Sequence, residues 1–248
     1  MRCKVPGKAI GTAWEDRYRP PSVSALYLHI PFCSSKCAYC DFASWATRAD
    51  DAIMGRYVRS LMAQLDEVAA FGLLDGVRTA YVGGGTPSLL GPTLLGRLVS
   101  RVRELCPELV ELSCEANPES LSDELLCALV QSGATRVSMG VQSLDDAELA
   151  ALGRAHTADV ALKRLEAAVA SGLDVSCDLM CAIPLQTRQG WLRSLEGVAS
   201  LGVAHVSVYP LSIEEGTALA RRVGDAVPTW NDSDVQAARM REAQDFLG

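Results

Sequence analysis

The amino-acid sequence predicts an α/β protein built on a parallel sheet, and two observations predict this class. From Ala25 onward, short apolar runs alternate six times with longer amphipathic runs. The short runs are rich in Val and Leu, which is typical of parallel strands buried on both faces. Repeated β-then-α units form a parallel sheet with right-handed crossovers, so these patterns leave two architectures open. One is an open doubly wound sheet, and the other is an incomplete (β/α)6 barrel.

The elements follow one another in a regular order. Residues 1–24 contain three prolines and little periodic pattern, so we expect an N-terminal extension at 1–24 and one core domain at 25–248. A Ser-Asp-Glu cap at Ser122 begins one of the helices. The predicted strands are 25–30, 78–82, 110–114, 135–139, 173–181 and 205–209. The predicted helices are 51–71, 92–105, 122–131, 145–152, 158–171, 189–201 and 232–246.

Composition and charge exclude several classes of protein. The 248 residues carry a formal net charge of -7, which argues against a general nucleic-acid partner. No stretch resembles a secretory signal, and none approaches the ~20 apolar residues that span a bilayer. We therefore expect a cytoplasmic protein without a transmembrane segment. Six of the nine cysteines are scattered through apolar segments and are expected to be buried free thiols of a reducing compartment. They are Cys3, Cys106, Cys114, Cys127, Cys177 and Cys181.

The other three cysteines form a compact motif directly after the first predicted strand. Cys33, Cys37 and Cys40 have the spacing Cys-x3-Cys-x2-Cys, with no fourth cysteine nearby. Three thiolates bind three corners of a cubane iron–sulfur cluster and leave the fourth iron open to a further ligand. A zinc site completed by His29 or Asp41 is an alternative, as is a disulfide that leaves one thiol unpaired.

Polar or glycine-rich residues also follow nearly all of the remaining predicted strands. In parallel α/β folds the reactive loops lie at the carboxyl ends of the strands, so we expect a site at this edge. Each feature alone also has an ordinary role, such as a tight turn for the glycines, a helix cap for a carboxylate, or surface exposure for Arg154. His156 and His205 are expected to be structural, and His29 to brace the cysteine loop. The features are Gly83-Gly84-Gly85-Thr86, Glu115-Ala-Asn117, Gly140-Val-Gln142-Ser143, Arg154 and Asp178.

These motifs together resemble the oxygen-independent coproporphyrinogen III oxidase family of radical S-adenosylmethionine (SAM) proteins. The similarity extends from Tyr27 to Thr217, about three-quarters of the chain. Its pieces are HIPFC with the three cysteines, GGGTPSLL, EANPE, RVSMGVQSLDD, LGRAH, SCDLM and HVSVYPLSIEEGT.

The resemblance implies a radical SAM core, a partial (β/α)6 barrel of parallel strands. It implies a [4Fe-4S] cluster held by Cys33, Cys37 and Cys40, with S-adenosyl-L-methionine chelated to the open iron. It also implies a reducing electron donor, because one electron cleaves SAM and starts radical chemistry on a substrate. The residues that match cofactor-contacting positions of the family are Tyr27, Tyr39, Gly84, Gly85, Thr86, Glu115, Gln142, Arg154 and Asp178.

Three departures from the oxidases refine this expectation. Phe42 stands where the oxidases usually have another cysteine, and Cys-Asp-Phe is similar to the heme chaperone branch of the family. That branch implies heme or porphyrin as ligand and a heme-accepting protein as partner, with oxidase activity as the alternative. Family members usually continue into a C-terminal domain, which this chain is expected to lack, and no His-Asn pair of the branch's heme motif occurs. Cys181-Ala182 replaces the family's aromatic residue and glycine, which predicts a changed loop after the fifth strand.

Overall fold

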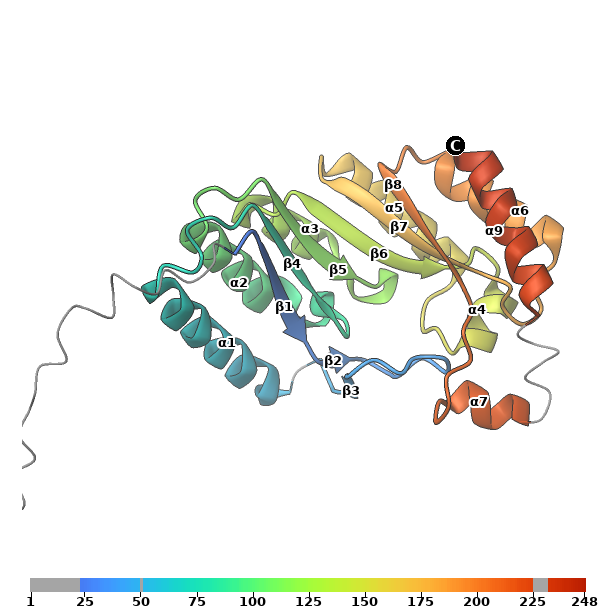
Figure 1. Ribbon diagram of the computed structural model, residues 1–248, viewed down its shortest axis with the longest axis horizontal. Helices are drawn as coiled ribbons and strands as arrows, with labels where there is room; N and C mark the ends of the chain where they lie inside the picture. The colour runs from blue at the N-terminus through green and yellow to red at the C-terminus, as the bar shows by residue number, and fades with distance from the viewer. Residues whose placement is uncertain (1–22, 50, 225–231) are drawn as a thin grey trace, which may run out of the picture.

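The computed structural model describes residues 23–49, 51–224 and 232–248 (Figure 1). Residues 1–22 of the predicted extension, with Cys3, lie outside these ranges. The centre of the fold is one six-stranded parallel sheet whose strands neighbour each other in the order in which they occur in the chain. The strands are β1 (Ala25–Ile30), β4 (Thr79–Gly84), β5 (Glu111–Ala116), β6 (Arg136–Gln142), β7 (Asp174–Cys181) and β8 (His205–Pro210).

The sequential strand order decides between the two predicted architectures. In a doubly wound sheet the order reverses at a switch point and helices cover both faces. Here each new strand is added on the same side, so right-handed crossovers bring the helices to one face. The chain is therefore a partial (β/α)6 barrel, as the resemblance implied. Figure 1 shows β1 and β8 at the two ends of the row of strands. The helices are α1 (Ala52–Ala70), α2 (Gly91–Leu105), α3 (Asp123–Ser132), α4 (Asp146–Leu152), α5 (Ala158–Ala170), α6 (Arg188–Ala199), α7 (Ala218–Val223) and α9 (Ser233–Leu247).

The two faces of the sheet differ sharply in polarity. Side chains alternate along each strand, and one set, such as Leu112, Val137 and Leu179, packs against the helices in the main core. The other set, such as Ser138 and Asp178, faces a cavity inside the barrel. The expected burial of the strands on both faces holds for inner-face residues such as Ser138, but the inner face is polar, which the Val- and Leu-rich pattern does not indicate. Its polar residues are needed there because that face lines a cavity instead of packing against helices.

The predicted strands and helices are all present, with ends shifted by a few residues. The cap of α3 is as predicted, since the Ser122 side chain accepts from the backbone N–H of Leu125 at 3.2 Å. Short elements were not predicted because two to six residues carry too little periodicity to detect. They are β2 (Phe32–Cys33), β3 (Trp45–Ala46), α7 and the 3-10 turns η1 (Pro87–Leu90) and η2 (Pro118–Ser120).

The described cysteines outside the triad are free thiols, as expected. Cys106, Cys114, Cys177 and Cys181 are buried. Cys127 is exposed, and the expectation of burial is wrong for it: α3 directs the flanking leucines inward and this position toward solvent. Within the described segments, no helix combines the length and apolarity that crossing a lipid bilayer requires.

A second, smaller apolar core anchors the cysteine loop. The Ala38 N–H donates to the Leu152 carbonyl at the end of α4 (2.9 Å), and the Ala38 carbonyl accepts from the Leu219 N–H of α7 (2.6 Å). Figure 1 shows α7 beside this loop. The loop is thus held from outside the barrel by backbone bonds and apolar burial together. The buried members of this core are Ala38, Leu152, Met180, Ile183, Leu211 and Leu219.

Candidate cofactor site

A cavity of about 670 Å³ opens inside the barrel, beneath the cysteine loop. It is bounded by the inner faces of β4 to β8 and by the loops after them, so it occupies the edge where parallel sheets usually place ligands. Eleven of the twelve predicted site residues line it; these are Cys33, Cys37, Tyr39, Cys40, Gly84, Gly85, Thr86, Glu115, Gln142, Arg154 and Asp178. Tyr27 does not line it, but stacks on Tyr81, which does, at a ring-centroid distance of 6.2 Å.

The three thiols of the motif are partly exposed to the cavity and unpaired. Cys33 ends β2, and the Cys40 N–H donates to the Cys37 carbonyl at 3.2 Å, which closes the loop between them. Among the described residues, no three His, Cys, Asp or Glu side chains converge on a point that would suit one metal ion. A zinc ion needs such convergence, whereas a cubane presents a separate iron to each thiolate.

The glycine loop passes close to the backbone of the cysteine loop. The N–H groups of Gly85 and Thr86 donate to the carbonyls of Ile30 and Phe32, both at 2.7 Å. A Cβ added at Gly85 would lie 2.6 Å from the Phe32 oxygen, so this approach requires glycine. The Gly84 N–H donates to Glu115 Oε2 at 2.9 Å. These backbone N–H groups therefore all donate to acceptors within the protein. The groups that the loop can offer to a ligand's ammonium group are its carbonyl oxygens.

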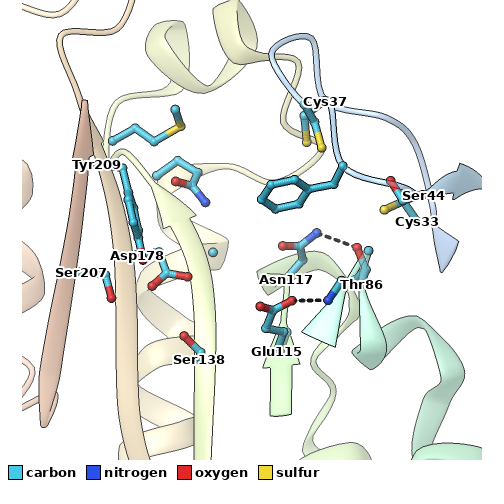
Figure 2. A pocket seen from close by; sticks show the side chains of 18 of the residues that line it. Cys33, Cys37, Ser44, Thr86, Glu115, Asn117, Ser138, Asp178, Ser207 and Tyr209 are labelled. Atoms are coloured by element: carbon cyan, nitrogen blue, oxygen red, sulfur yellow. Dashed lines mark hydrogen bonds between the residues drawn. The ribbon is translucent and has the colours of Figure 1, made fainter. Parts of the chain in front are cut away.

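Two partly buried carboxylates, Glu115 and Asp178, face each other across the cavity (Figure 2). Burial raises the pKa of Glu115 above its ordinary value, although hydrogen bonds from Tyr81 (2.8 Å) and the Gly84 N–H oppose the rise. Burial likewise raises the pKa of Asp178, opposed by hydrogen bonds from Ser207 and Ser138. Such groups are poised to accept hydrogen bonds from hydroxyl or ammonium groups of a ligand.

Arg154 supplies one of the positive charges that line the cavity. Its Nη2 donates to Asn117 Oδ1 at 2.8 Å and to the Gly140 carbonyl at 2.6 Å, and its Nη1 lies 3.4 Å from Cys37 Sγ. Burial by itself would lower the pKa of Arg154. The electrostatic interactions with Tyr39, Cys37 and Glu119 are stronger than this effect and raise the pKa of Arg154 above its ordinary value. Its buried Nε has no partner among the described residues, which leaves one donor for a ligand carboxylate.

Gln142 has an unusual backbone conformation at the end of β6. Its φ is 69°, and the pairing of β6 with β7 shifts register between Gly140 and Gln142. Left-handed conformations are costly for residues other than glycine and cluster at functional sites. His156 stabilises this segment from behind, because its Nε2 donates to the Val141 carbonyl at 3.1 Å and its Nδ1 lies 3.3 Å from Glu119. This agrees with the structural role expected for His156.

Several residues of the site were not predicted from the motifs. Tyr81 holds Glu115, while Ser138 and Ser207 contact Asp178. Asn117 bridges Thr86 Oγ1 at 3.1 Å and Arg154, as Figure 2 shows for the first bond. Asn117 follows β5 and belongs to the predicted Glu115-Ala-Asn117 feature, whereas the unpredicted Tyr81, Ser138 and Ser207 lie on strands at alternate positions relative to core residues. The alternation of polar and apolar residues along these strands was the signal that could have found them.

A partial barrel with a three-thiol loop, a glycine loop and two partly buried carboxylates around one cavity defines the chain as an α/β-barrel protein with a candidate cofactor site. The model of the radical SAM superfamily matches residues 27–197, and the chain belongs to that family. The family implies a [4Fe-4S] cluster and SAM. The residues present fit both, since three free thiols line the cavity beside an unpartnered Arg154 Nε, which suits an amino-acid-bearing cofactor next to a thiolate-bound cluster.

Relatives and solved structures agree with this assignment. The chain is 40% identical over 225 residues to the "Heme chaperone HemW" of Mycobacterium tuberculosis, covering 89% of this chain and 57% of the relative. It is 36% identical over 205 residues to the HemW of Escherichia coli, covering 80% and 53%. The structure of coproporphyrinogen III oxidase (HemN) from Escherichia coli superposes with a TM-score of 0.79 at 27% identity, covering 92% and 53%. The chain spans about half the length of the curated relatives it matches.

Proposed function

We propose that the cavity binds a [4Fe-4S] cluster on Cys33, Cys37 and Cys40, with SAM beside it. The observation that carries the proposal is the convergence of eleven motif residues on one cavity of about 670 Å³. When bound, such a cluster supplies the one-electron chemistry of the family, and a reducing donor must provide that electron. The chain's own residues bind and orient the cofactor and enclose it.

The individual roles follow from charge and hydrogen-bonding capacity. Arg154 remains charged and presents a free donor, so it is suited to the methionine carboxylate. Glu115 and Asp178 accept hydrogen bonds and suit the ribose hydroxyls and the amine. The glycine loop lines the cavity at Gly84 and Gly85, so its backbone carbonyls are suited to the methionine ammonium group. The other proposed contacts are Tyr27, Tyr39, Thr86 and Gln142.

We propose further that the chain is the SAM-binding part of a heme chaperone, which binds heme or porphyrin and passes heme to a protein acceptor. Two observations favour this over oxidase activity. The most similar relatives quoted above are HemW proteins at 36% to 40% identity, against 27% for the oxidase structure. Phe42, in place of a cysteine, lies at the cavity with 64% of its surface exposed. An exposed aromatic side chain suits contact with a flat macrocycle.

Anaerobic reconstitution of the 248-residue chain with iron and sulfide tests the cofactor proposal. We expect about four irons per chain, broad absorption near roughly 400 nm, and saturable SAM binding by calorimetry. Adding hemin to the reconstituted protein is then expected to give a saturable absorption shift. Reduced protein incubated with SAM and coproporphyrinogen III is expected to yield no vinyl product. Vinyl product would support the oxidase instead, and absence of both iron uptake and SAM binding would contradict the proposal as a whole.

Tyr81→Phe tests the role of Glu115. Removing the Tyr81 hydroxyl deletes a hydrogen bond to the ionised carboxylate, which contributes about 1.5–3 kcal/mol, so SAM affinity should fall by at least about tenfold. The pKa of Glu115 should also rise further. Because binding requires ionised Glu115, affinity is lost as pH falls through that pKa, and in the variant the loss should begin at higher pH. Calorimetric SAM titrations between about pH 5.5 and 8.5 measure both effects.

A matched control uses Tyr57, whose hydroxyl donates to an uncharged acceptor, the backbone carbonyl of His29, at 2.7 Å. Tyr57→Phe removes the same atom but should leave the pH profile of SAM binding unchanged. Identical pH profiles for wild type and Tyr81→Phe would contradict the role given to Glu115.

A further inference from the structure

Ser44 is a buried serine in the segment between Cys40 and β3. It lines the cavity, only 6% of its surface is exposed, and its Oγ has no hydrogen-bond partner among the residues that the structure describes. Its backbone is engaged, since the N–H donates to the Phe42 carbonyl at 2.7 Å. A buried hydroxyl without an acceptor destabilises a folded protein, so an orphan of this kind requires an explanation.

The strand register directs the Ser44 side chain toward Cys33. In the two-stranded sheet of β2 and β3, Cys33 pairs with Ala46, and the Thr47 N–H fixes this register by donating to the Cys33 carbonyl at 2.8 Å. Paired residues share a face, so Ala46 lies on the face of Cys33. Ser44 directly precedes β3, two residues before Ala46, and continuing the alternation of side chains places Ser44 on that same face. Figure 2 shows Ser44 next to Cys33. Trp45, on the opposite face, is exposed.

Ser44 and Cys33 both line the cavity. Cys33 is the acceptor that changes on cluster binding. A neutral thiol is a weak acceptor, but iron binds the thiolate, and a hydrogen bond to an ionised acceptor is about twice as strong. The orphan hydroxyl therefore gains a strong partner when Cys33 becomes a ligand.

We propose that Ser44 is a positioning residue that donates a hydrogen bond to the Cys33 thiolate and so sets the reduction potential of the cluster. The proposal rests on the proposed cluster and adds a residue that none of the family motifs includes. Reduction adds negative charge that spreads onto the sulfur ligands, and a donor to one of them stabilises the reduced form. Ser44 thus makes the cluster easier to reduce by a given electron donor.

Three variants of the reconstituted full chain test this role. Ser44→Ala removes the donor, and the midpoint potential from a redox titration followed by electron paramagnetic resonance should become more negative. Ser44→Thr keeps a hydroxyl and should restore a potential close to wild type. Ser35→Ala is the matched control, because Ser35 lies in the same loop and lines the same cavity but is exposed to solvent. Its potential should equal that of wild type.

A second measurement on the wild type does not depend on any variant folding. In D₂O, pulsed resonance spectra of the reduced cluster should show an exchangeable deuteron coupled to it. A Ser44→Ala potential equal to wild type, or wild-type spectra without such a deuteron, would overturn the inference. Failure of the wild type to assemble any cluster would overturn the proposed function itself. Iron analysis of the wild type distinguishes these two failures.

Discussion

Replacing Cys37 with alanine is expected to abolish cluster assembly and leave the barrel folded. Two thiolates would remain, and a cubane held at only two corners is not retained. Cys37 also lies 3.4 Å from Arg154 Nη1, so the variant removes a partner of the site's cation. Its thiol is partly exposed and belongs to neither apolar core, so truncation should cost little stability. Iron content after anaerobic reconstitution should fall from about four per chain to near zero.

Cys127→Ala provides the matched control for this experiment. Cys127 is a free, exposed cysteine on α3, away from the cavity lining, so its removal should leave iron content unchanged. Circular dichroism and urea unfolding should give wild-type-like curves for both variants. Full iron uptake by Cys37→Ala would show that the three-cysteine motif does not hold the cluster, and would require a different set of ligands.

The class of fold could be predicted because local patterns and topology agree. Six apolar runs with amphipathic runs between them admit few arrangements, and right-handed crossovers leave a barrel or a doubly wound sheet. The choice between these two depends on whether the strand order reverses, and local sequence patterns do not encode strand order. The resemblance carried by the motifs supplied that choice. Strands β2, which ends at Cys33, and β3, which follows Ser44, have only two residues each and therefore show no periodic pattern. The face on which Ser44 lies could not be predicted for the same reason.

The interior of the barrel could have been predicted more fully than it was. The run Glu-Leu-Ser-Cys-Glu of β5, ending at Glu115, alternates polar and apolar residues, as does His-Val-Ser-Val-Tyr of β8. A period of two with one polar face indicates a strand with a solvated or cavity-lining side. The Cys181-Ala182 pair predicts a changed loop after the fifth strand, but only the structure shows the backbone conformation of that loop. Ala182 has a φ of 55°, a conformation that glycine adopts without strain, so alanine at this position strains the turn after β7.

Gly84→Ala is expected to destabilise the protein and to loosen the cysteine loop. Gly84 has a φ of 118°, which a residue with a Cβ rarely adopts, and the added Cβ would lie 2.5 Å from His29 Nδ1. The His29 ring has little freedom to move, because its Nε2 donates to the Ala43 carbonyl (2.9 Å) and its Nδ1 accepts from the Tyr27 hydroxyl (3.2 Å). Backbone strain of about 1–3 kcal/mol therefore adds to the loss of hydrogen bonds. We expect a total of about 3 kcal/mol or more from urea unfolding.

Gly172→Ala distinguishes the cost of backbone strain from the cost of steric overlap by the added Cβ. Gly172 also has a positive φ, 83°, but an added Cβ would meet no atom within 4 Å, so only the conformational cost of about 1 kcal/mol should appear. The difference between the two variants measures what the contact with His29 contributes. Because His29 binds the carbonyl of Ala43, three residues after Cys40, Gly84→Ala should also lower iron retention, whereas Gly172→Ala should not. Equal destabilisation by both variants, with full iron content in each, would show that His29 does not connect the glycine loop to the cysteine loop.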